Sequence, residues 1–113
     1  MNTRGRAAER HAAELLRKQG LRVLARNWRC RFGEIDLVAR DGPTLVFVEV
    51  RLRASAAFGG AAESIDAAKR RKLIAAANLY LSARGAASPC RFDAVLIEAD
   101  GHTRWVRDAF RAD

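Results

Sequence analysis

Two apolar stretches joined by a short turn limit what this chain can fold into more than any other feature. EIDLVAR (34–40) and TLVFVEVRLR (44–53) are rich in valine, leucine, isoleucine and phenylalanine, and Asp41-Gly42-Pro43 separates them. This composition predicts two antiparallel β-strands inside a sheet that is covered on both faces. The rest of the chain must therefore supply the covering layers.

Turn signals and apolar periodicity place the remaining elements. They predict helices at about 3–19 and 64–83, the second with Ser64 as N-cap, and strands at 21–28, 90–100 and 102–110. The order is α-β-β-β-α-β-β. Short turns make the first three strands antiparallel neighbours, and the long helix before the fourth suits a parallel crossover. The sequence thus predicts an α/β fold, a mixed five-stranded sheet with a helix on each face.

Size and charge narrow the class of partner. The 113 residues suffice for a single domain (1–113) with one modest core. A formal charge of +8 and a pI near 10.9 favour a polyanion, either nucleic acid or an acidic membrane surface. No segment has the apolar core of a signal peptide or the roughly 18 apolar residues of a membrane span, so a cytoplasmic protein with no membrane partner is expected. Cys30 and Cys90 form no metal-ligand pair with either histidine.

Three acidic side chains, Glu34, Asp36 and Glu49, interrupt the two apolar strands. Side chains alternate along a strand, so Glu34 and Asp36 should share one face and Ile35 and Leu37 the other. Like charges opposed across a sheet destabilise it by some tenths to about 1 kcal/mol when exposed, and by more when buried. The pattern therefore indicates either a solvated, neutralised face or a site that holds a cation.

The length of the turn sets the register of the two strands. A four-residue loop at 41–44 pairs Arg40 with Leu45. The same register would place Asp36 opposite Glu49, so the two carboxylates should lie close together.

Each helix brings charged side chains into its apolar stripe. Glu9 lies in the middle of the stripe that should pack on the sheet, and Lys69 and Lys72 flank the stripe of the second helix. The functional interpretation is that Glu9 joins the hairpin acids around a hard divalent ion, while a lysine faces phosphate or the acids. The alternatives are a salt-bridged Glu9, lysines that snorkel along the sheet edge, and a solvated hairpin face neutralised by Arg51.

These motifs together resemble a known group of proteins. An acid on one strand followed by Glu49-Val50-Arg51 on the next resembles the PD-(D/E)XK nuclease superfamily. More narrowly, the chain is similar to the YraN-like family of small bacterial proteins, which is related to archaeal Holliday junction resolvases. The residues that carry this resemblance are Gly5, Glu9, Asn27, GEIDL (33–37), FVEVR (47–51), Lys69, ANLYL (77–81) and RFD (91–93).

The resemblance implies a fold, an activity and a partner. The fold is a three-layer α/β/α restriction-endonuclease-like domain. The activity is that of a metal-dependent endonuclease that hydrolyses DNA phosphodiester bonds, on branched or single-strand-containing DNA. Because a four-way junction is two-fold symmetric, a homodimer is compatible with this activity.

The resemblance also assigns residues to a site. It implies that Asp36, Glu49 and the carbonyl of Val50 bind Mg²⁺ or Mn²⁺. Glu9 would contribute from the first helix, and Glu34 would lie at the rim. The ion would lower the pKa of a bound water and stabilise charge on the phosphate under attack.

One position departs from the superfamily pattern. Arg51 stands where the superfamily has a lysine, and an arginine does not give up its proton. Arg51 can still orient water or hold phosphate, and Lys69 or Lys72 is a candidate for the lysine's catalytic role. Two alternatives therefore stay open: a nucleic-acid-binding module that has lost catalysis, and a structural partner protein whose acids are only salt-bridged.

Further basic and aromatic residues are candidates for DNA contacts. Trp28 or Phe58 could stack on an unpaired base, although Trp28 could equally pack in the core. The loop at 54–62 would border the cleft. The candidate arginines for backbone contacts are Arg4, Arg6, Arg10, Arg29, Arg31, Arg53, Arg70 and Arg71.

Overall fold

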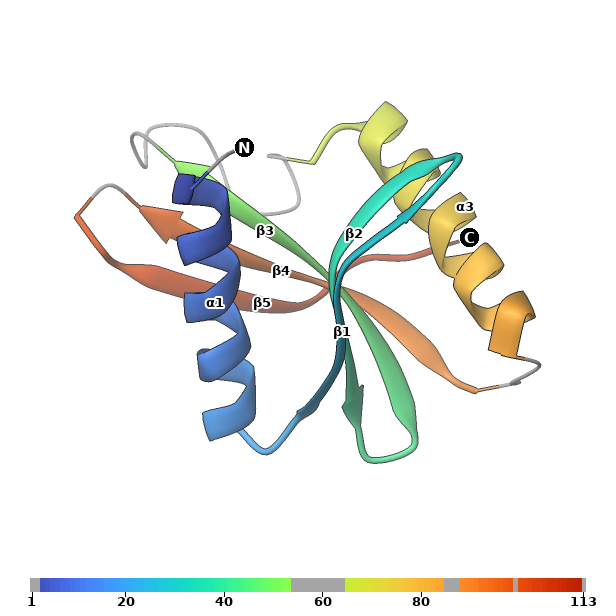
Figure 1. Cartoon of the computed structure of the whole chain (residues 1–113), viewed down its shortest axis with the longest axis horizontal. Coiled ribbons are helices and arrows are strands. Elements are labelled where there is room, and N and C mark those ends of the chain that lie inside the picture. Colours follow the sequence, from blue (N-terminus) through green and yellow to red (C-terminus); the bar gives the residue numbers. More distant parts are fainter. Residues whose placement is uncertain (1–2, 54–64, 85–87, 99, 113) are drawn as a thin grey trace.

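A mixed five-stranded sheet between two helices forms the framework of the protein, in a computed structural model that describes residues 3–53, 65–84, 88–98 and 100–112. The strand order is β1-β2-β3-β4-β5, with β3 and β4 parallel and the other neighbours antiparallel (Figure 1). The predicted class, element order and strand directions are confirmed. The elements are α1 (Thr3–Lys18), β1 (Arg22–Cys30), β2 (Gly33–Asp41), β3 (Thr44–Arg53), α3 (Ala67–Arg84), β4 (Cys90–Glu98) and β5 (Thr103–Phe110).

Most element ends lie within two residues of their predicted places. Gly20, with a left-handed φ of 93°, follows the end of α1, as expected for a helix C-terminus. The N-cap of α3 differs from the prediction. Asp66 caps this helix, because its Oδ1 accepts a hydrogen bond from the Lys69 N–H at 2.8 Å, and the predicted cap Ser64 lies outside the described residues. The first strand continues to Cys30 rather than ending at Trp28.

The two helices cover opposite faces of the sheet, which gives the predicted three-layer α/β/α architecture (Figure 1). The α1 face buries Ala12, Ala13 and Leu16 against Leu37, Ala39, Val46, Val48 and Val95. The α3 face buries Leu73, Ala76, Ala77 and Tyr80 with Ile35, Phe47, Phe92 and Leu96. The central strands are therefore apolar on both sides, as their composition requires.

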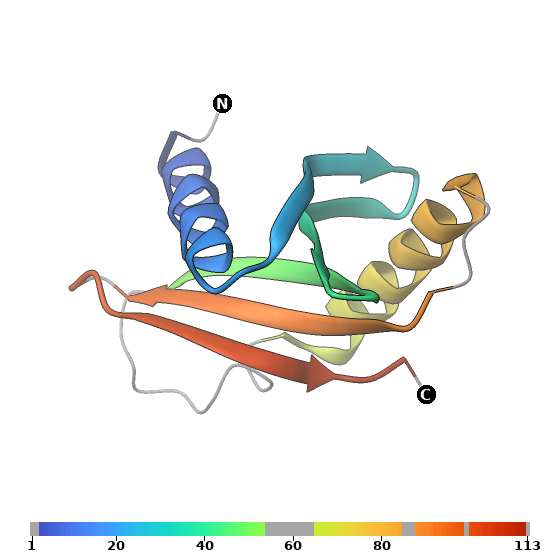
Figure 2. The same cartoon turned by 90° about the horizontal axis from the view of Figure 1, so that it is seen from below.

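The β1–β2 hairpin bends away from the rest of the sheet (Figure 2). The β2–β3 ladder confirms the predicted pairing of Arg40 with Leu45 but ends at Leu37 and Val48. Beyond that point β2 pairs only with β1 among the described residues. The predicted alternation is wrong at Ile35, which packs on the α3 face although Leu37 packs on the α1 face.

The bend has a local cause in β1. Asn27 lies between the residues paired with Leu37 and Ile35 and has a φ of 54°. Asparagine tolerates this left-handed conformation better than most residues. Trp28 follows directly and packs edge-on against Tyr80 of α3, with ring centroids 5.2 Å apart. This contact holds the bent part of the hairpin on the α3 side.

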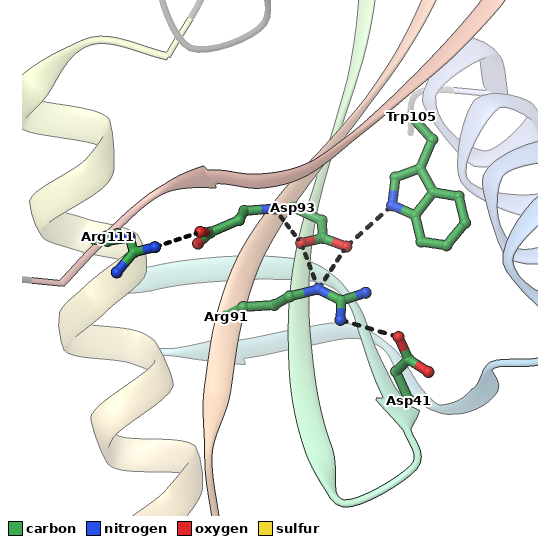
Figure 3. A network of polar contacts seen from close by, with 6 residues as sticks. Asp41, Arg91, Asp93, Trp105 and Arg111 are labelled. Carbon is green, nitrogen blue, oxygen red and sulfur yellow. Dashed lines mark hydrogen bonds and ion pairs between the residues drawn. The ribbon is translucent and has the colours of Figure 1, made fainter.

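A buried polar network joins β4 to β5 (Figure 3). Asp93 is fully buried and accepts hydrogen bonds from Arg91 Nε at 3.0 Å and Trp105 Nε1 at 3.0 Å. It also accepts one from the Asp108 N–H at 2.9 Å, where the β4–β5 ladder shifts register. Arg91 Nη1 reaches Asp41 at 2.9 Å. Asp93 therefore supplies a hydrogen-bond acceptor where the β4–β5 ladder is irregular. Through Arg91 it is also linked to Asp41 at the β2–β3 turn.

Candidate functional site

A cavity of about 350 Å³ lies where β2 and β3 part. The Val50 N–H points into the gap beyond the last ladder pair and donates a hydrogen bond to Asp36 Oδ2 at 2.8 Å. The bend of the hairpin thus fixes the Asp36 carboxylate beside β3. The lining residues are Gly5, Ala8 and Glu9 from α1, Asp36 from β2, and Glu49, Val50, Arg51 and Leu52 from β3.

The structure brings the predicted acids together. Glu9, Asp36 and Glu49 all line the cavity. Carboxylate oxygens of Glu9, Glu34 and Asp36 lie within 4.8 Å of one another, and Glu34, whose side chain is 34% exposed, does not line the cavity. Arg29 Nε lies 3.5 Å from the Glu34 carboxylate. Acids from α1, β2 and β3 therefore meet in this cavity, with Glu34 beside Glu9 and Asp36.

The charge of Asp36 is strongly disfavoured in this surrounding. Burial, the charge of Glu49 and a hydrogen bond between these two carboxyls raise the pKa of Asp36 to about 8. The charge of Glu9 acts in the same direction, while the hydrogen bond from the Val50 N–H favours the ionised form. A cation among the acids would supply the compensation that the protein alone does not provide.

The two oxygens of Glu49 have different surroundings, although the residue as a whole is only 5% exposed. Its Oε2 lies 3.4 Å from Arg51 Nη1 and 3.5 Å from Lys69 Nζ. Its Oε1 is buried and, when the acids are ionised, has no hydrogen-bond partner among the described residues. Leaving such an oxygen unsatisfied costs about 1–3 kcal/mol or more. Together with the nearby carboxylates, this oxygen fits a hard divalent ion.

The two candidate lysines have different positions. Lys69, in the first turn of α3, approaches Glu49 from the face opposite α1. Lys72, one turn later, is exposed. Arg51 and Lys69 together partly neutralise Glu49, which is nevertheless buried rather than on a solvated face.

Of the two aromatic candidates, Trp28 does not line the cavity. Trp28 packs on Tyr80, so its packing alternative is confirmed. Phe58 and the loop at 54–62 lie outside the described residues.

The candidate arginines fall into three groups. The side chains of Arg4 and Arg53 lie outside the described residues. Arg70 is partly buried and donates to the Ile65 carbonyl at 2.8 Å. The exposed candidates are Arg6, Arg10, Arg29, Arg31 and Arg71.

Sequence reasoning did not identify two features around the site. The bend that opens the cavity had a signal in Asn27, a residue type that accepts a positive φ within a strand. Arg31 and Phe32, at the end of the hairpin, form an exposed pair with the guanidinium 4.8 Å from the ring centroid. The sequence signal for this pair was Arg31-Phe32 directly before Gly33, because residues in a turn are usually exposed.

The fold and the site define a small three-layer α/β/α protein with a carboxylate-lined cavity between two parting strands. The family model described as "Uncharacterised protein family UPF0102" matches residues 8–97, from α1 to β4. This chain belongs to that family, which is the YraN-like family that its motifs resemble.

Similar UPF0102 proteins occur in several bacteria. The protein of Methylobacillus flagellatus is 58% identical over 115 residues, covering 99% of this chain and 100% of the relative. That of Pseudomonas entomophila is 55% identical over 112 residues, covering 94% and 91%. That of Nitrosomonas europaea is 52% identical over 109 residues, covering 95% and 92%. Neither described helix is long and apolar enough to cross a membrane.

Proposed function

We propose that this protein is a Mg²⁺- or Mn²⁺-dependent endonuclease that hydrolyses phosphodiester bonds in branched or single-strand-containing DNA. One observation carries the proposal: Glu9, Asp36 and Glu49 converge in one cavity, where a buried Glu49 oxygen has no hydrogen-bond partner among the described residues when the acids are ionised. The formal charge of +8 favours a polyanionic substrate. The resemblance to the PD-(D/E)XK superfamily supplies the reaction class and the DNA structure.

The acids of the cavity would hold the ion. Asp36 and Glu49 are its principal ligands, Glu9 contributes from α1, and Glu34 and the Val50 carbonyl are further oxygens within the same region. A bound Mg²⁺ or Mn²⁺ supplies Lewis-acid stabilisation of the phosphate and a water of lowered pKa.

The two basic residues that contact Glu49 have separate tasks. Arg51 lines the cavity, and its planar guanidinium suits two-point contact with a phosphate. Lys69 lies 3.5 Å from Glu49, where its ammonium can position water and can also exchange a proton. An arginine does not give up its proton. We therefore assign phosphate binding to Arg51 and the lysine role of the superfamily to Lys69. A DNA substrate would also place the protein in the cytoplasm.

Calorimetric titration with Mn²⁺ tests the site without any choice of substrate. We expect saturable binding by the natural protein, none by Asp36→Asn, and unchanged binding by Glu14→Gln, an exposed acid on α1. Forked, four-way and duplex DNA are then incubated with Mn²⁺ and each protein. Cleavage by the natural protein that Asp36→Asn retains would overturn the assignment of the site.

A non-catalytic nucleic-acid-binding module is the second candidate. The ion pair of Glu49 with Arg51 favours this candidate for two reasons. The arginine cannot serve as a base, and it partly neutralises Glu49 without a metal ion. Such a module binds DNA in a strongly salt-dependent way and does not hydrolyse it even in Mn²⁺. Under this candidate only Arg51→Lys cleaves DNA, whereas the endonuclease proposal requires cleavage by the natural protein.

A further inference from the structure

We propose that the hairpin tip, residues 29–33 between β1 and β2, recognises unpaired DNA, with Phe32 stacking on a base and Arg29 and Arg31 contacting the adjacent phosphates. This inference rests on the proposed function and names the surface that would select the substrate. The argument combines an exposed aromatic ring, its flanking charges and its position beside the acids.

The ring of Phe32 is presented to solvent. Phe32 is 37% exposed, and it is the one aromatic residue among the exposed large hydrophobic residues in the described part of the chain. The guanidinium of Arg31 lies 4.8 Å from its ring centroid, so cation and ring form one amphipathic unit. Stacking on such a ring is tolerant of sequence, because every base offers a flat π face.

The charges around the ring suit a nucleic-acid backbone. The side chain of Arg29 is 80% exposed, and that of Arg31 is also exposed. Two arginines beside an aromatic residue combine the backbone charge and the base stacking that single-strand-binding surfaces use. A purely apolar protein partner would offer no charge to Arg31 and would leave Arg29 only its ion pair with Glu34.

The hairpin tip adjoins the candidate centre. Arg29 lies 3.5 Å from Glu34, whose carboxylate is within 4.8 Å of those of Glu9 and Asp36. Phe32 lies in the turn two positions before Glu34, so their Cα atoms are at most about 7 Å apart. This is on the order of one or two nucleotides of a strand. A base held at Phe32 would therefore place a neighbouring phosphate near the acids.

The bend of the hairpin makes this arrangement accessible. The tip stands away from the plane of β3, β4 and β5 (Figure 2). Leu52, 45% exposed on the other side of the parting strands, also lines the cavity. Apolar groups on both arms favour a substrate with exposed bases over an intact duplex, whose bases are stacked and covered.

Binding without metal tests the inference separately from cleavage. Fluorescence anisotropy in EDTA compares a single strand, a fork and a blunt duplex of equal length, for the natural protein, Phe32→Ala, Phe32→Trp and Leu24→Ala. Leu24 is the matched control, because it is 41% exposed on β1 but lies far along the strand from the tip. Phe32→Ala should weaken binding of the single strand and the fork roughly fivefold or more, and of the duplex by less than about twofold. Phe32→Trp should restore the preference, and Leu24→Ala should not change it.

Each other outcome has a defined meaning. Equal weakening for all three DNAs, or none, overturns the role of Phe32 while leaving the proposed function intact. A change of oligomeric state in Phe32→Ala, seen by sedimentation, would instead make the tip a contact with a second copy or another protein. If the natural protein binds none of the DNAs, this inference and the proposed function both fail. Melting curves of each variant show whether it is folded, and Phe32→Trp keeps the test decisive if Phe32→Ala is not.

Discussion

The Val50 N–H donates a 2.8 Å hydrogen bond to Asp36 Oδ2 across the gap between β3 and β2. This bond replaces the ladder hydrogen bond that the bend of β2 removes, and a side chain thus continues the sheet where the backbone has left it. The hydrogen bond holds the Asp36 carboxylate against β3, in the same cavity as Glu49. Its position is therefore coupled to the shape of the sheet.

Removing the charge of Asp36 should stabilise the metal-free protein at neutral pH. The pKa of this acid is raised from 3.8 to about 8, first by burial and then by Glu49. An acid with a raised pKa binds more protons in the folded state, so its contribution to stability is full below pH 3.8 and is lost as the pH rises towards about 8. Asp36→Asn keeps an acceptor for Val50 and should raise the melting temperature in EDTA at pH 8 by about 3–8 °C.

Thermal unfolding in EDTA between pH 4 and 8 measures this effect. As the pH rises over this range, the melting temperature of the natural protein should fall relative to that of Asp36→Asn. The melting temperature of Glu14→Gln should change with pH as that of the natural protein does. A lower melting temperature of Asp36→Asn at the upper end would mean that the protein itself compensates the ionised carboxylate.

Metal binding should release a proton. Because Asp36 is protonated below about pH 8, an ion that requires the carboxylate must displace its proton. The apparent Mn²⁺ affinity should therefore increase with pH up to about 8, by at most roughly tenfold per unit for one proton. Calorimetry in two buffers of different ionisation enthalpy counts the protons released, and a count near zero would exclude Asp36 as the displaced acid.

Lys69 and Lys72 should differ in their effect on cleavage. Lys69 contacts Glu49 at 3.5 Å, whereas Lys72 is exposed on the same helix. With saturating metal and DNA, Lys69→Met should lower the cleavage rate by roughly a hundredfold or more, and Lys72→Met should change it little. A pH–rate profile that loses one limb in Lys69→Met would indicate that Lys69 transfers a proton. An equal loss of rate in both variants would mean that the two lysines act only as positive charges towards the DNA backbone.

Asp93 should be essential for stability and not for the chemistry. It is fully buried and accepts hydrogen bonds from Arg91, Trp105 and the Asp108 main chain (Figure 3). Asp93→Ala leaves these donors unpaired and should cost about 3–5 kcal/mol in urea unfolding.

The matched control for Asp93 is Arg111→Ala, which removes an exposed ion pair with Asp108. It should cost no more than about 1 kcal/mol. Comparable losses in the two variants would show that the network around Asp93 is not a stability determinant.

Much of the site was predictable because its signals are local. Turn length placed Asp36 near Glu49, and helical periodicity turned Glu9 towards the sheet. The position of Lys69 near the start of α3 followed from the same periodicity. The Asp93 network was not predictable in this way, because it depends on a register shift between β4 and β5 and on Asp41 from a distant turn.

The sequence by itself determined the elements, their order, the strand directions and the register at the central turn. These properties depend on side-chain periodicity and on turn chemistry, which act over a few residues. Only the tertiary structure decided that β2 leaves β3 after Leu37. That parting depends on contacts such as Trp28 with Tyr80, more than fifty residues apart in the chain, which compete with the last ladder hydrogen bonds. The physical reason is that packing between distant segments outweighs a few backbone hydrogen bonds, and no local pattern encodes this balance.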